Sequence, residues 1–175
     1  MKTQIRVLKS KSVYKGRIIH VKVDRVVEPG GVEATREVVE HRGSVVILPR
    51  LSDGCIILVR QYRYAARRHL WELVAGSMEP GESVIRAARR ELQEETGYRA
   101  GSLKRIFSFY PSPGFLTEQM HMVEASDLKL STAAPEEDER IEVRAFSRTE
   151  IDKLIRNRKI IDGKTLVGVM WQGRR

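Results

Sequence analysis

The most constraining segment of this 175-residue chain is a helix with acidic residues on its apolar face. Ser83 is a favourable N-cap and Gly97 a favourable helix stop, which predicts a helix over residues 83–96. At about 100° per residue, one sector of the helix collects the apolar side chains Val84, Ile85, Ala88 and Leu92. Glu91 and Glu95 fall inside or beside that sector. The helix must therefore pack against a core while carrying two carboxylates.

These two carboxylates need a compensating charge. Glu91 and Glu95 are four residues apart, so they are neighbours that repel each other, and burial adds a further cost. A divalent cation between them would remove both problems, and oxygen-only ligands suit Mg²⁺ or Mn²⁺ rather than Zn²⁺. Arg90 and Glu94 have the same spacing on another flank, where they can pair and orient the helix. The alternative is an ordinary charged surface helix.

Residues 76–98 resemble the signature of the Nudix hydrolases. The fixed positions of that signature are filled at the required spacing by Gly76, Glu82, Arg90, Glu91, Leu92, Glu94, Glu95 and Gly97, and Tyr98 places an aromatic residue in its last apolar position. The resemblance implies an α/β fold, an α/β/α sandwich with a mixed sheet. It also implies hydrolysis of a nucleoside diphosphate linked to another moiety.

The same resemblance assigns roles to the residues of the signature. It implies that Glu91 and Glu95 bind metal with help from a backbone carbonyl near Ala75. It implies that Arg90 and Glu94 support these ligands as part of the catalytic set, and that Glu82 has a structural role.

Beyond the signature, the chain resembles the ADP-ribose pyrophosphatase branch of the family. The resemblance is carried by residues 36–41, 60–63 and 71–76, and by a proline sixteen positions after Gly97. It implies substrate-binding roles for Arg36, Arg63, Glu72 and Pro113. Arg63 is the candidate phosphate clamp, because a guanidinium can contact phosphate oxygens with two donors. A solvated arginine is the alternative.

A general base is expected in the acidic stretch 135–142, where the same branch offers a glutamate to the metal or the water. Glu139 is the first candidate and Glu142 the second, since neighbouring acids leave the register open. By composition this stretch is also compatible with a plain solvated loop. Glu118 resembles another acid near the site and receives no defined role.

The hydrophobic pattern divides the chain into residues 1–42 and 43–175. Alternation over 17–27, with Ile19, Val21 and Val23 on one side and Asp24 on the other, predicts a half-buried strand, and 34–41 predicts a second. A β unit this small needs a partner surface. The resemblance implies that it is swapped across a homodimer, where Arg36 reaches the nucleotide site of the partner.

Residues 43–175 are predicted to form the catalytic domain. Strands are expected over 44–49, 55–60, 69–74, 105–110, 119–125 and 141–146, with helices over 149–158 and 164–171. Hairpin turns among these strands argue against an all-parallel sheet. We therefore expect a mixed sheet with helices on both faces.

The amino-acid composition of the chain limits the kinds of molecule it is expected to bind. The chain has 32 basic and 23 acidic residues, a net charge of +9, which is compatible with binding nucleic acid, with binding small anions, or with a solvated basic surface. No aromatic-rich basic strand is present, so binding to RNA, as in decapping, is disfavoured. The longest apolar run, Cys55–Val59, is too short for a membrane span, and the N-terminus lacks an apolar signal region. A single cysteine, expected to be buried, indicates a cytoplasmic protein.

Taken together, the sequence predicts Mg²⁺-dependent hydrolysis of ADP-ribose to AMP and ribose 5-phosphate, with Mn²⁺ as an alternative metal. The first alternative substrate is GDP-mannose or another sugar nucleotide. A second alternative is a nucleotide-sensing binding module without catalysis, against which the complete glutamate set argues. The pattern does not fix the preferred sugar nucleotide or the number of metals.

Overall fold

The computed structural model describes residues 4–131 and 141–173. Contacts within these ranges form two compact units. The first contains residues 4–43 and Tyr110–Gln119, and the second contains Ser44–Phe109 with the described residues from Met120 onward.

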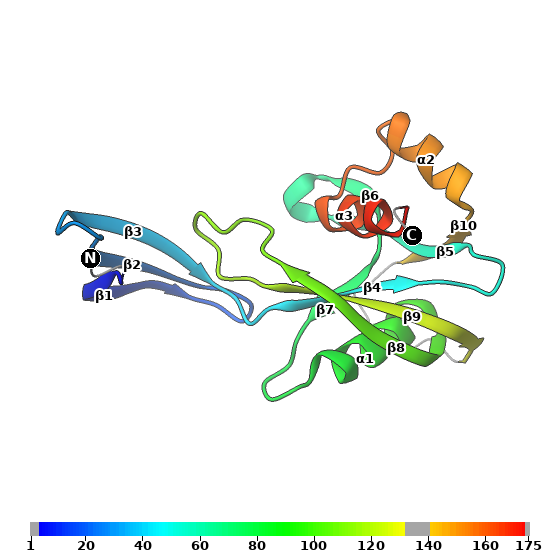
Figure 1. Cartoon of the computed structure of the whole chain (residues 1–175), viewed down its shortest axis with the longest axis horizontal. Coiled ribbons are helices and arrows are strands. Elements are labelled where there is room, and N and C mark those ends of the chain that lie inside the picture. The colour runs from blue at the N-terminus through cyan, green and yellow to red at the C-terminus, as the bar shows by residue number, and fades with distance from the viewer. Residues whose placement is uncertain (1–3, 132–140, 174–175) are drawn as a thin grey trace. The chain divides into compact units, whose positions relative to one another are not determined.

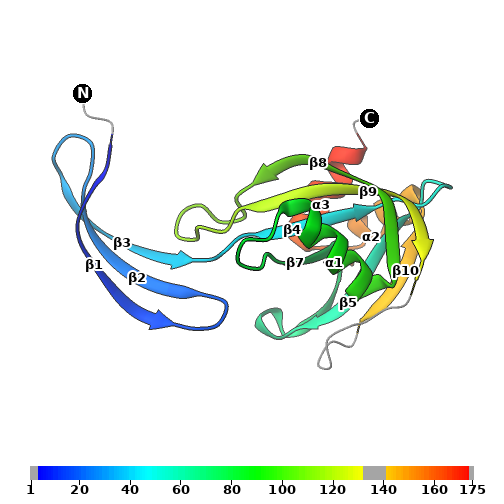
Figure 2. The ribbon, with the colours of Figure 1, turned by 90° about the horizontal axis from the view of Figure 1, so that it is seen from below.

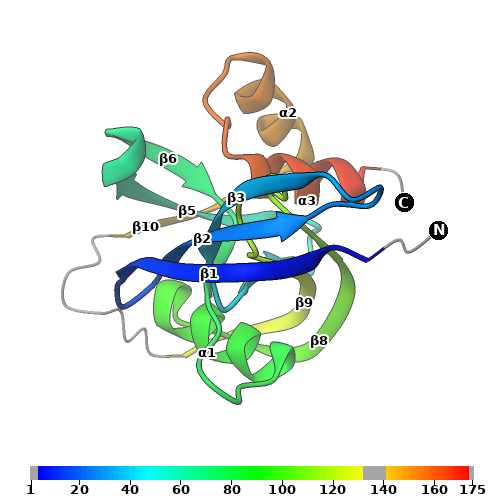
Figure 3. The same cartoon turned by 90° about the vertical axis from the view of Figure 1, so that its left-hand side faces the viewer.

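The first unit is a three-stranded antiparallel sheet, seen in Figure 3, joined to a loop. Its strands are β1 (Arg6–Lys15), β2 (His20–Val27) and β3 (Glu33–Glu40), in that spatial order. The loop Tyr110–Gln119 is tied to β3 by two backbone hydrogen bonds, from Val39 N to Phe115 O at 2.8 Å and from Thr117 N to Val39 O at 2.9 Å.

Two features of this sheet differ from the sequence prediction. Every residue of β1 is exposed, and this strand was not predicted because its residues show no clear alternation. In β2 the alternation placed Asp24 on the solvent side, but Asp24 is only 7% exposed, next to buried Val26. The predicted orientation of β2 is therefore wrong at this position.

The second unit is built on a four-stranded sheet in the order β7-β4-β9-β8. Its strands are β4 (Ser44–Pro49), β7 (Val74–Ser77), β8 (Tyr98–Phe109) and β9 (Met120–Leu130). β4 and β9 run parallel, whereas β4–β7 and β8–β9 are antiparallel, so the sheet is mixed as predicted.

A second sheet in this unit has the order β10-β5-β6, with strands β10 (Glu142–Phe146), β5 (Ile56–Arg63) and β6 (Arg68–Glu72). A short 3₁₀ turn, Tyr64–Ala66, joins β5 to β6. The single strand predicted over 69–74 is divided at Leu73 between β6 and β7. Cys55, predicted to be buried, is half-buried at the turn that precedes β5.

Three helices cover the two faces of the four-stranded sheet, α1 (Val84–Thr96) on one and α2 (Arg148–Arg156) with α3 (Gly163–Gln172) on the other (Figures 1 and 2). The alternation of β4 explains this division. Val45 and Ile47 pack in one cluster with Leu92 of α1. Val46 and Leu48 pack in the other with Ile151 and Val169, from α2 and α3. The fold is therefore the predicted α/β/α sandwich. Among the described residues, no helix has the length and apolar character needed to cross a membrane.

Candidate functional site

The α1 helix presents its glutamates on the buried face. The Ser83 hydroxyl accepts a hydrogen bond from the Arg86 backbone N–H at 3.4 Å, and Gly97 ends the helix in the left-handed conformation with φ 73°. Glu91 and Glu95 are only 8% and 6% exposed. Their predicted burial is confirmed, so the chain accommodates two carboxylates at a sheet-facing surface.

Arg90 connects α1 to the loop that precedes it. Its Nη1 donates to Glu91 Oε1 at 2.7 Å and to Glu94 Oε2 at 3.1 Å. Its Nε and Nη2 donate to Glu82 at 3.2 and 3.0 Å, and Nη2 also donates to the Ser77 carbonyl at 3.2 Å. Arg90 thereby sets the position of the Glu91 carboxylate. The hydrogen bonds to Glu82 raise the pKa of Arg90 and lower the pKa of Glu82, so both stay charged.

Gly76, on β7, gives the Glu91 carboxylate its space. A Cβ atom at position 76 would lie 2.0 Å from Cδ and Oε1 of Glu91. Real Cβ contacts are never that short, so only glycine lets the carboxylate occupy this position. The glycine is required by this close approach.

The arrangement fits a hard divalent cation. Two buried carboxylates on consecutive turns of α1 form a donor set of the kind that Mg²⁺ or Mn²⁺ prefers. Within residues 4–131 and 141–173, no three His, Cys, Asp or Glu side chains are arranged to hold a metal. An ion at Glu91 and Glu95 would therefore complete its coordination with other oxygens, such as the Ala75 carbonyl, water or a phosphate.

Sequence reasoning missed part of a second cluster, formed by Arg63, Glu72 and Lys164. Arg63 donates to both carboxylate oxygens of Glu72, Nε to Oε1 at 2.9 Å and Nη2 to Oε2 at 2.7 Å. Lys164 Nζ also binds Glu72 and lies 3.1 Å from Asp162. Glu72 is 1% exposed, whereas the Arg63 side chain is 40% exposed. Glu72 therefore fixes the plane of a guanidinium that solvent and ligands can still reach.

The charges of this cluster reinforce one another. The hydrogen bonds with Glu72 raise the pKa of Arg63, and the nearby negative charges of Glu95 and Asp162 act in the same direction. Burial alone would raise the pKa of Glu72, but hydrogen bonds from Arg63 and the charge of Lys164 hold it below its usual range. The influence of Glu95 on Arg63 links this cluster to the glutamates of α1.

Glu72 gives a prediction for the dependence of stability on pH. Its folded pKa lies below the ordinary 4.5, so its stabilising effect is complete above pH 4.5 and is lost as the pH falls through the folded pKa. Glu72→Gln should lower the unfolding free energy at neutral pH by roughly 2 kcal/mol. Denaturant unfolding between neutral and acid pH should show this difference shrinking as the pH falls.

The control for that experiment is Asp152→Asn, which removes a partly exposed carboxylate that lies 3.0 Å from Arg148 Nε. It should change the unfolding free energy by less than about 1 kcal/mol at any pH. A constant difference between wild type and Glu72→Gln down to acid pH would show that Glu72 is not held in its charged form.

The structure also shows the surroundings of most of the other residues that the sequence singled out. Arg36 and Pro113 belong to the first unit, where Arg36 Nη2 is paired with Glu28 at 2.6 Å and Pro113 is exposed. Glu118 in the same unit lies 3.6 Å from His41 Nδ1. Glu142 is paired with Arg60 at 3.2 Å. Glu139 lies outside the described residues, so its role remains a prediction.

Comparison with known proteins places this geometry in a family. Residues 40–165 match the NUDIX domain, and residues 5–39 match the nucleoside diphosphate sugar hydrolase N-terminal domain. The chain is 36% identical over 168 residues to the ADP-ribose pyrophosphatase of Bacillus subtilis strain 168, an alignment covering 95% of this chain and 91% of the relative. It is 34% identical over 146 residues to the GDP-mannose pyrophosphatase of Yersinia enterocolitica, covering 78% and 76%.

A crystal structure of an ADP compounds hydrolase has the same fold, with a TM-score of 0.86 at 23% identity, covering 98% of this chain and 93% of that one. The buried glutamates of α1 and the close approach of Gly76 to Glu91 fit the Nudix signature. The matches along the chain indicate the same family. The chain belongs to the Nudix hydrolase family, in the group that contains ADP-ribose and other nucleoside diphosphate sugar pyrophosphatases.

Proposed function

We propose that this protein hydrolyses the pyrophosphate bond of ADP-ribose, which gives AMP and ribose 5-phosphate, or that of a related nucleoside diphosphate sugar, in a Mg²⁺-dependent reaction. The main observation behind the proposal is that Glu91 and Glu95 are both buried on one face of α1. Gly76, which has no side chain, leaves the space that the Glu91 carboxylate occupies. The relatives support the substrate class, since they are named for ADP-ribose and GDP-mannose.

Nudix hydrolases generally need a divalent metal, and we propose Mg²⁺ here, with Mn²⁺ as a substitute. When bound, such an ion would supply positive charge at the pyrophosphate oxygens and make a water molecule easier to deprotonate. Glu91 and Glu95 hold it, and Arg90 orients Glu91 through its 2.7 Å hydrogen bond. Because the carboxylates are already fixed, little reorganisation is needed when substrate arrives.

Arg63 is proposed to contact a phosphate oxygen through the exposed part of its guanidinium. Glu72 fixes the plane of that group, and Lys164 fixes Glu72. The general base is proposed to be Glu139, with Glu142 as the second candidate. A base is needed because carboxylates that bind metal are poor proton acceptors.

A hydrolysis panel tests the proposal. ADP-ribose, GDP-mannose, NADH and diadenosine polyphosphates should be incubated with the protein and Mg²⁺, and their products separated by chromatography. We expect ADP-ribose to give the highest kcat/KM, with AMP and ribose 5-phosphate in equal amounts. GDP-mannose as the best substrate would support the alternative. Saturable nucleotide binding without turnover of any compound would contradict the proposal and support a nucleotide-sensing module.

We further propose that the protein is a homodimer assembled through its first unit. All of β1 is exposed, and the first unit leaves apolar side chains in solvent, among them Val7, Val13 and Tyr14 of β1 and Ile18 of the turn after it. Exposed apolar side chains gathered in one region mark an interaction surface, and a second copy is the partner that would cover it. We also infer a cytoplasmic location, because one cysteine cannot form an internal disulfide.

If the protein is a dimer, its mass in solution should be twice that of one chain. Sedimentation velocity at micromolar concentration should give a dimer for the wild type. Val7→Asp/Val13→Asp, which places charges on the exposed strand, should shift the boundary toward the monomer. A wild-type protein that sediments as a monomer would rule out the assembly and the swapped arrangement with it.

A further inference from the structure

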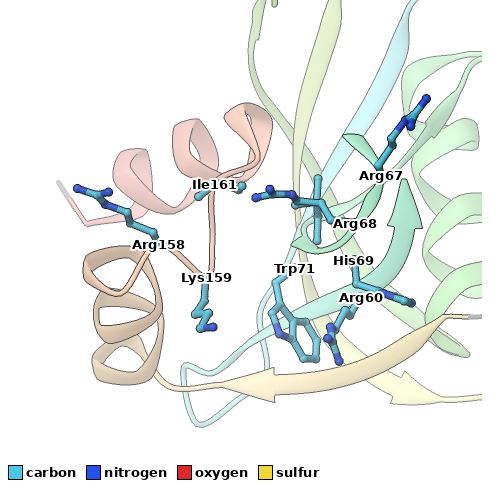
Figure 4. Close-up of a pocket in the computed structure, with 9 residues that line it drawn as sticks. Arg60, Arg67, Arg68, His69, Trp71, Arg158, Lys159 and Ile161 are labelled. Carbon is cyan, nitrogen blue, oxygen red and sulfur yellow. The ribbon is translucent and has the colours of Figure 1, made fainter. Parts of the chain in front are cut away.

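A strongly basic pocket lies in the second unit, and of its lining residues only Arg60, the partner of Glu142, has been discussed so far. Its volume is about 390 Å³, and Figure 4 shows the side chains that line it. Among the described lining residues none is acidic and five are cationic, namely Arg60, Arg67, Arg68, Arg158 and Lys159. None of the lining residues belongs to α1 or to the cluster of Arg63, Glu72 and Lys164. The pocket is a separate concentration of positive charge.

Most of this charge has no carboxylate partner among residues 4–131 and 141–173. Arg60 is paired with Glu142 at 3.2 Å, and its guanidinium lies 5.9 Å from the ring centroid of Trp71. The other four cationic side chains form no ion pair with a carboxylate in the part of the chain that the structure describes. Like charges gathered in one pocket repel one another, and a bound anion would relieve that repulsion.

The backbone at two of these positions carries a separate signal. Arg67 and Arg158 have φ values of 52° and 55°, in the left-handed region that favours glycine. Arg67 directly follows the 3₁₀ turn, and Arg158 lies two residues after the end of α2 at Arg156, in a motif closed by hydrogen bonds from Arg158 N to Ile155 O and from Lys159 N to Leu154 O. Glycine is the usual residue at such helix ends.

Both arginines therefore stand where the backbone would accept glycine more easily. Only one other non-glycine residue within the described ranges, Asp127, has a positive φ. Backbone strain at a cluster of like charges is an observation from which a function of these side chains can be inferred as a hypothesis. An arginine in this position adds cost to the fold and places a positive charge at the margin of the pocket.

We propose that this pocket binds a small phosphate-bearing anion. Figure 4 shows Arg68 and Lys159 reaching toward the space beside Trp71 from two walls, β6 and the loop after α2, whereas the guanidinium groups of Arg67 and Arg158 extend away from it at the margins. Arginine can bind phosphate oxygens with two donors, and lysine adds a mobile point charge. The half-buried indole of Trp71 offers an apolar surface next to these charges.

Calorimetric titration of the full chain tests the site. The protein is kept in excess EDTA, so that no divalent metal draws an anion to the carboxylates of α1. Inorganic pyrophosphate and ADP are the two probes, each titrated at low and at high salt. We expect saturable binding that weakens with salt, because the lining charges are exposed. Equal affinities would assign recognition to phosphate alone, and tighter binding of ADP would extend the site to the nucleoside; both results support the pocket.

The decisive variant is Arg68→Ala/Lys159→Ala. It should weaken binding of both probes by at least about 10-fold. Arg67→Gly/Arg158→Gly, at the margins, should weaken binding less, while the midpoint of thermal unfolding stays the same or rises, since glycine suits both φ values. The matched control, Lys104→Ala/Lys129→Ala, removes two exposed charges from β8 and β9 and should bind like wild type.

Two results would overturn the proposal. One is the absence of saturable binding to the wild-type protein at low salt. The other is binding by Arg68→Ala/Lys159→Ala that equals binding by the control. Neither depends on catalysis, so the proposed hydrolase activity stands or falls separately.

Discussion

Glu95→Gln should reduce Mg²⁺-dependent hydrolysis of ADP-ribose by at least about 100-fold, the scale of losing one preorganised charge that stabilises a transition state. The substitution keeps the size of the side chain and removes its charge. The unfolding free energy should stay the same or rise slightly, because Glu91 and Glu95 repel each other across one turn of α1. Steady-state kinetics and denaturant unfolding on the same preparation measure both effects.

The combination of lost activity and retained stability is what separates a metal ligand from a structural acid. Asp152→Asn serves again as the control and should keep wild-type kinetics, since its carboxylate is on the surface of α2. Near-normal turnover by Glu95→Gln would remove Glu95 from the proposed metal site. A large loss of stability would instead indicate a structural role.

Gly76→Ala should lower kcat/KM by about 100-fold or more while leaving the fold nearly intact. The new methyl group would lie 2.0 Å from the Glu91 carboxylate, so that carboxylate must move. It is the end of a flexible side chain, and its movement should cost about 1–3 kcal/mol of unfolding free energy, less than the usual stability of a domain. The loss of activity should therefore occur in a protein that is still folded.

Gly163→Ala is the matched control for this change. Gly163 begins α3, and a Cβ atom there would meet nothing within 4 Å. Its activity should equal that of wild type, with a stability slightly higher because alanine favours helix. If Gly76→Ala also retained full activity, the position of the Glu91 carboxylate would not matter for the reaction.

Local patterns in the sequence were sufficient to predict α1. Its cap at Ser83, its stop at Gly97 and the burial of Glu91 and Glu95 depend on residues within one helix. Strand β4 was equally predictable, because a continuous apolar run is what a strand buried on both faces requires.

Features that depend on distant contacts were not predictable. Lys164 meets Glu72 across 92 positions of sequence, and a lysine in the first turn of a helix carries no signal for that partner. The burial of Asp24 also depends on what packs against the sheet, and alternation within β2 pointed the other way. Strand β1 was missed because a fully exposed strand has no apolar face to reveal it.

The central claim is that Glu91 and Glu95 hold the divalent ion, and it is tested most directly by metal binding. Electron paramagnetic resonance of free Mn²⁺, titrated with chelator-treated protein, measures that binding without substrate. We predict saturable Mn²⁺ binding to the wild type, displaced by Mg²⁺, and its loss in Glu91→Gln/Glu95→Gln. Equal Mn²⁺ binding by the wild type and this variant would contradict the claim.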